Sequence, residues 1–138
     1  MENDKEIKEA SSTPSQSAKC VVIPSTLLLT KQNRQSLESI LETIEEITGV
    51  PPHLYMATKK RTTPHVTLRQ ITAYCLKEYT NITLKDIGII QGMRDHSTII
   101  HSLKTVGTWM DGAPGFTYEK KLVESIMKIY GEKCQNSI

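Results

Sequence analysis

The spacing of apolar residues restricts the fold of this chain more than any other feature. Between residues 36 and 48 apolar side chains recur at steps of three and four, with glutamates between them, and the apolar positions are Leu37, Ile40, Leu41, Ile44 and Ile47. This spacing is typical of an amphipathic helix with one buried face. Similar patterns follow downstream, and no segment alternates convincingly between apolar and polar residues. The sequence therefore predicts an all-α protein.

Start and stop signals divide the chain into about six helices. Gly49 and Gly131 are typical helix ends, Pro51 and Pro52 open a short helical turn, and Thr83 begins a capping-box pattern. We expect helices over residues 36–48, 64–79, 83–90, 95–110 and 117–130. Residues 1–34 are predicted to be a weakly ordered or disordered tail, residues 35–131 a helical domain, and residues 132–138 a C-terminal tail.

Charge is distributed unevenly along the 138 residues, although the net charge is only +2. Residues 1–50 hold five basic and eight acidic side chains, whereas residues 53–104 hold eight basic and three acidic ones, together with all four histidines. A basic centre is typical of a protein that binds a polyanion. A solvated, lysine-rich helical face would give the same distribution, so charge alone does not decide between them.

The cysteines and the apolar runs indicate the cellular compartment of the protein. The three cysteines, Cys20, Cys75 and Cys134, are far apart, which argues against a disulfide scaffold and against a zinc site. The longest apolar run, residues 20–29, is interrupted by Pro24 and is too short to cross a membrane. We therefore expect a cytoplasmic protein with no bound metal, no cofactor and no membrane association.

The helices predicted at 83–90 and 95–110 are joined by a short glycine-containing turn, as in a helix-turn-helix. In that motif the first turn of the second helix faces base edges in the major groove of DNA. Here that turn carries side chains able to bond guanine, cytosine or either base of a pair. These candidate major-groove residues are Arg94, Asp95, His96, Ser97 and Thr98. His101 and Lys104 follow on the exposed side, where phosphates would lie.

Each of these residues also has a structural interpretation. Asp95 is a good N-cap, and capping explains it better than base contact does when it is considered alone. Arg94 is harder to explain structurally, because a cation at a helix N-terminus is unfavourable without a nearby anion. The segment Lys59-Lys60-Arg61 is either a solvated loop or a second contact to phosphates or the minor groove.

Residues 87–101 carry a family resemblance. Ile87-Gly88, followed by Gly92-Met-Arg-Asp-His-Ser-Thr-Ile-Ile-His101, is similar to the signature of the DNA-binding C-terminal domain of the bacterial replication initiator DnaA. Upstream, Arg69-Gln70 and the run Leu76-Lys-Glu-Tyr-Thr80 resemble that family's preceding helix. The resemblance covers about residues 35–130. It implies a six-helix, Trp-repressor-like fold that binds a short duplex box.

Carried over by position, the resemblance places residues 94–98 in the major groove and a minor-groove arginine within Lys59–Arg61. It implies phosphate contacts by Arg69, Lys85 and Lys104. The sequence departs from the family at Met93, which replaces a glycine, and at Gln91, which replaces an aromatic residue. Val66-Thr67 stands where the family often has Ala-Arg. These departures suggest weaker binding or an altered box.

Two functional hypotheses follow from these residues. The first is sequence-specific binding of double-stranded DNA, in a replication or regulatory accessory role. The alternative is a protein-interaction module that retains the fold, with a partner bound through the N-terminal segment around Val21–Leu29. The sequence has no Gly-x-x-x-x-Gly-Lys-Ser/Thr motif and no supported catalytic triad, so we expect neither ATP binding nor enzymatic activity.

Overall fold

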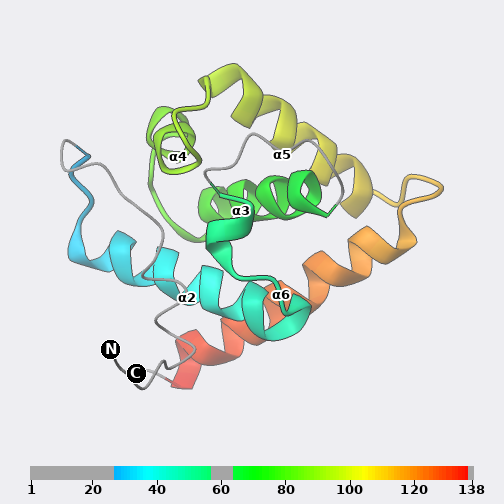
Figure 1. Cartoon of the computed structure of the whole chain (residues 1–138). Coiled ribbons are helices and arrows are strands. Elements are labelled where there is room, and N and C mark those ends of the chain that lie inside the picture. The colour runs from blue at the N-terminus through cyan, green and yellow to red at the C-terminus, as the bar shows by residue number, and fades with distance from the viewer. Residues whose placement is uncertain (1–26, 57–63, 137–138) are drawn as a thin grey trace, which may run out of the picture.

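The computed structural model describes residues 27–56 and 64–136, which form five α-helices and one short 3-10 helix (Figure 1). The helices are α2 (Lys31–Thr48), η1 (Pro52–Leu54), α3 (His65–Tyr79), α4 (Leu84–Ile90), α5 (His96–Met110) and α6 (Thr117–Asn136). No strand occurs in these two ranges, and the all-α prediction is confirmed. None of the helices described is long and apolar enough to span a bilayer.

Helix α3 lies at the centre of the molecule and contacts each of the other four α-helices (Figure 1). Its side chains Leu68, Ile71 and Leu76 are no more than 2% exposed, and Thr72 and Ala73 on its other sides are buried too. A helix surrounded in this way buries more than the single stripe that an amphipathic pattern marks. The buried apolar residues of all five α-helices form one continuous core.

Local capping explains where several helices begin and end. The Thr83 hydroxyl accepts a hydrogen bond from the Asp86 N–H at 3.1 Å, which confirms the predicted start of α4. Gly49 ends α2 with a φ of 76°, and its N–H donates to the Glu45 carbonyl at 2.7 Å. This left-handed C-cap is the role expected of a glycine just beyond a helix.

Two predicted helix bounds were wrong. Helix α2 begins at Lys31 rather than Ser36, with the Thr30 side chain as its N-cap, because its first turn is polar and exposed and leaves no apolar period to detect. Helix α6 continues through Gly131 to Asn136, where the Lys133 ammonium lies 3.0 Å from the Glu46 carboxylate of α2. The expected boundaries at residues 35 and 131 therefore fall inside helices, while residues 1–26 and 137–138 lie outside the described structure.

Candidate nucleic-acid interface

A tight turn joins α4 to α5 and sets the angle between them. Gly92 and Met93 both have left-handed backbone conformations, with φ values of 86° and 63°. The turn folds back so closely that the Arg94 N–H donates to the Gly88 carbonyl at 2.8 Å. A Cβ atom on Gly88 would lie only 2.2 Å from the Arg94 carbonyl oxygen. This close approach of two backbones is the physical reason for glycine at position 88.

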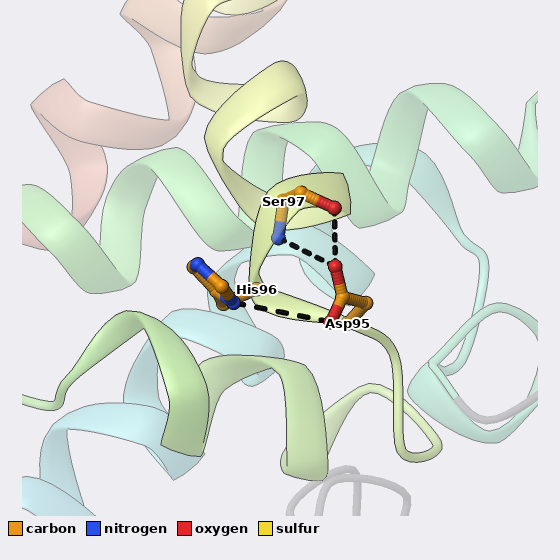
Figure 2. A network of polar contacts seen from close by, with 3 residues as sticks. All are labelled: Asp95, His96 and Ser97. Carbon is orange, nitrogen blue, oxygen red and sulfur yellow. Dashed lines mark hydrogen bonds and ion pairs between the residues drawn. The ribbon is translucent and has the colours of Figure 1, made fainter.

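The first turn of α5 is exposed, polar and held by Asp95 (Figure 2). The Asp95 Oδ2 atom accepts the Ser97 N–H at 3.1 Å and also the Ser97 hydroxyl. The His96 Nδ1 atom lies 3.9 Å from Asp95 Oδ1, and the His96 side chain is 62% exposed. The capping interpretation of Asp95 is thus confirmed, and His96 lies outside the core. A cap of this kind also fixes the direction of the side chains beside it.

Hydrogen bonds from the Ser97 hydroxyl and the Ser97 N–H hold the pKa of the Asp95 carboxyl below its usual value. Because this pKa is lowered on folding, the charged Asp95 carboxylate stabilises the folded state. The stabilisation is fully present when the pH is above the ordinary pKa of an aspartate, about 4. That contribution is lost as the pH falls through the lower value of the folded protein. The cap is therefore charged at neutral pH.

We expect Asp95→Ala to lower the midpoint of thermal unfolding by a constant amount between about pH 7 and pH 5, and by less as the pH falls below about 4. The midpoint can be followed by circular dichroism across this range. Asp95→Asn keeps one acceptor oxygen and should lie between wild type and Asp95→Ala at neutral pH. A difference that grows on acidification would contradict this role.

Arg94 and Arg69 are both directed at the end of η1. The Arg94 Nη1 atom donates to the Met56 carbonyl at 3.3 Å and also to the Gln91 carbonyl. The Arg69 Nη1 atom donates to the Tyr55 carbonyl at 3.2 Å. Arg69 from α3 and Arg94 from the turn before α5 thus donate to consecutive backbone carbonyls, which ties the end of η1 both to α3 and to the helix-turn-helix.

Burial separates Arg94 and Arg69 from the other predicted contacts. Arg69 is only 7% exposed and Arg94 is half-buried. By contrast, Thr98, His101, Lys104 and Lys85 are all exposed. A phosphate contact by Arg69 stays a prediction, and its position inside α3 makes it less accessible than the sequence suggested. Buried arginines are ordinarily paired, as this one is with a carbonyl.

Sequence reasoning missed the role of Gln91. Its side chain is 1% exposed, and its Nε2 atom donates to the Arg69 carbonyl at 3.0 Å. The Gln91 amide therefore attaches the turn to α3, at a position where the sequence departs from the family's aromatic residue. The signal available in the sequence was that Gln91 departs from the family signature at this position.

An open hollow of about 590 Å³ lies between α3 and the start of α5. Its lining combines α3, the turn and the outer face of α5, and the residues involved are Val66, Arg69, Gln70, Gln91, Gly92, Met93, Arg94, Thr98, His101 and Ser102. The basic segment Lys59–Arg61 lies outside the described residues, but Met56, three residues before it, is bonded to Arg94.

Two helices joined by this turn, the second with its exposed N-terminal turn beside an open hollow, define a helix-turn-helix protein. The family model for the bacterial DnaA protein helix-turn-helix matches residues 37–106, which is half of the chain. The chain belongs to this family of DnaA helix-turn-helix domains.

Curated relatives agree with this family. The chain is 33% identical over 102 residues to chromosomal replication initiator protein DnaA of Herminiimonas arsenicoxydans, covering 73% of this chain and 22% of that protein. The DnaA protein of Burkholderia multivorans is also 33% identical over 102 residues, with 73% of this chain and 19% of that protein covered. The chain thus spans about a fifth of the length of these relatives. No solved structure matches it.

Proposed function

We propose that this protein binds double-stranded DNA sequence-specifically, with the N-terminal turn of α5 in the major groove and the basic segment Lys59–Arg61 on an adjacent phosphate or minor-groove surface. It would act as an accessory in replication or gene regulation, in the cytoplasm, without a bound nucleotide and without catalysis. The observation that carries this proposal is the exposed, polar first turn of α5 in a chain of the DnaA helix-turn-helix family.

The chemistry of that first turn supports base recognition. Asp95 can accept from the cytosine N4 amino group, and the hydroxyls of Ser97 and Thr98 can donate or accept. Because Asp95 holds Ser97 through two hydrogen bonds, part of this array is already oriented before DNA binds. His101 follows Thr98 at a helical step of three, so both face the same side of α5. We propose that His101, Lys104 and Lys85 contact phosphates.

The anchored end of η1 supports a second contact. The basic segment Lys59–Arg61 begins three residues after Met56 in the sequence. The Met56 carbonyl accepts a hydrogen bond from Arg94, so the last described residue before the basic segment lies beside the start of α5. We propose that Arg94 has two roles, as a major-groove residue and as the link that positions this segment. Arg69 would support the link from α3.

The test is selection of bound sequences from a random duplex pool, followed by titration of the selected duplex and a scrambled one by fluorescence anisotropy. We expect one enriched box, and binding that weakens steeply between 50 and 200 mM salt because counterions are released from the phosphates. A chain that enriches no sequence, and whose affinity does not change with salt, would refute the proposal.

Lys60→Ala should weaken binding by a similar factor for the selected and the scrambled duplex, because a phosphate contact carries no sequence information. It should also reduce the slope of log affinity against log salt by about one. The matched control is Lys128→Ala, an exposed lysine in the C-terminal half of α6, which should leave both quantities unchanged. A loss confined to the selected duplex would contradict a phosphate role for Lys60.

One observation favours the alternative of a protein-interaction module. Leu28, within the N-terminal segment Val21–Leu29 and near the start of the described structure, is 89% exposed, and a large exposed leucine is suited to a protein contact. The salt titration separates the two functions, since an interaction module would not bind either duplex. Leu28→Ser should leave DNA affinity unchanged if the N-terminal segment serves only a protein partner.

A further inference from the structure

Met93 combines two unfavourable features at one position. Its side chain is 72% exposed, although it is large and apolar. Its backbone has a φ of 63°, the left-handed region that residues with a Cβ atom rarely adopt and that costs them about 1 kcal/mol or more. A glycine would avoid both. Local stability therefore does not explain why methionine stands here.

The surroundings of Met93 place it on the proposed DNA-binding face. It lines the same open hollow as Thr98 and His101 of α5 and Gln70 of α3. Apart from Val66, the other side chains around this hollow are polar or charged. Met93 is also only two residues before Asp95, the N-cap of the proposed recognition helix. It is thus an exposed apolar side chain within a polar base-reading surface.

We propose that Met93 is a specificity-determining residue that contacts the C5-methyl group of a thymine at the edge of the recognised box. This inference rests on the proposed function. The thymine methyl is the one apolar group that base pairs present in the major groove, so it is the partner that an apolar side chain can distinguish there. The flexible methionine side chain can follow the groove wall to reach it. The contact compensates for the strained backbone and the exposed surface.

Replacing thymine by deoxyuridine tests this contact, because it removes only the methyl group. Each thymine of the selected duplex is changed singly, and affinity is measured for wild type, Met93→Gly and Met93→Ala. For wild type we expect one position, or two adjacent ones, at which the change weakens binding about fourfold, the effect of losing one buried methyl group. In Met93→Gly and Met93→Ala the loss of affinity on replacing that thymine should disappear. Met93→Leu, which keeps a large apolar side chain, should show it as wild type does.

Thermal unfolding of the same variants checks that each is folded. Met93→Gly should be more stable than Met93→Ala, because only glycine relieves the left-handed conformation. The inference is overturned if wild type and both variants respond identically to every deoxyuridine. If wild type binds the duplex no better than a scrambled one, the proposed function fails, and the inference fails with it. The two failures are therefore distinguishable.

Discussion

Gly88→Ala is expected to destabilise the fold by about 3 kcal/mol or more and to abolish DNA binding with it. The added Cβ would lie 2.2 Å from the Arg94 carbonyl oxygen, far inside contact distance. The opposing atom belongs to the backbone, so no flexible side chain can move aside. Relief requires α4 and the turn to separate, which also breaks the hydrogen bond from the Arg94 N–H to the Gly88 carbonyl.

The matched control is Gly131→Ala, also a glycine inside a helix. A Cβ atom there meets nothing within 4 Å, and α6 continues through this position. We expect stabilisation by about 0.5–1 kcal/mol, since alanine is the better helix former. Urea denaturation of both variants measures the contrast. Equal effects of the two substitutions would refute the assignment of Gly88 as the point where α4 and the backbone of Arg94 approach most closely.

Arg94→Ala is expected to weaken binding to the selected duplex by about 10- to 100-fold, with a smaller loss for a scrambled duplex. Two causes act together. The substitution removes a guanidinium from the proposed major-groove surface, and it removes the donor that joins the Met56 and Gln91 carbonyls. Because the residue is half-buried, we also expect a loss of about 1–3 kcal/mol in folding stability.

Affinity should be measured at a temperature well below the midpoint of thermal unfolding of Arg94→Ala, so that its loss of stability does not appear as a loss of binding. Arg94→Lys keeps the charge but lacks the planar fork, so it should regain binding to the scrambled duplex more than binding to the selected one. Arg34→Ala, at an exposed position of α2, serves as the control and should change neither quantity. Unchanged specific binding by Arg94→Ala would exclude the proposed docking of α5.

Much of the fold could be predicted from local sequence. The apolar face of α2, the cap at Thr83 and the bounds of α3, α4 and α5 follow from periodicity and capping, which depend on residues a few positions apart. The start of α2 and the end of α6 could not be found in this way. Polar, exposed helical turns carry no apolar period, and Gly131 lies within α6, which packs against α2.

The candidate site was predicted in part. The residues of the first turn of α5, from Asp95 to Thr98, are exposed as a recognition surface requires, but their contacts with DNA stay predictions. Arg69 was expected at a phosphate and is buried against the Tyr55 carbonyl. No pattern within α3 reveals this, because the carbonyl belongs to a segment 14 residues away.

The sequence by itself determined that the chain is helical, where most of its helices lie, and that a polar stretch stands at the start of α5. These properties depend on side chains close together along the chain. Only the tertiary structure decided that Arg69 and Arg94 donate to neighbouring carbonyls and that the Gln91 amide attaches the turn to α3. It also decided that Met93 has a left-handed backbone conformation and an exposed side chain. Those outcomes depend on which backbone atoms meet when distant segments pack, and residue types do not specify that.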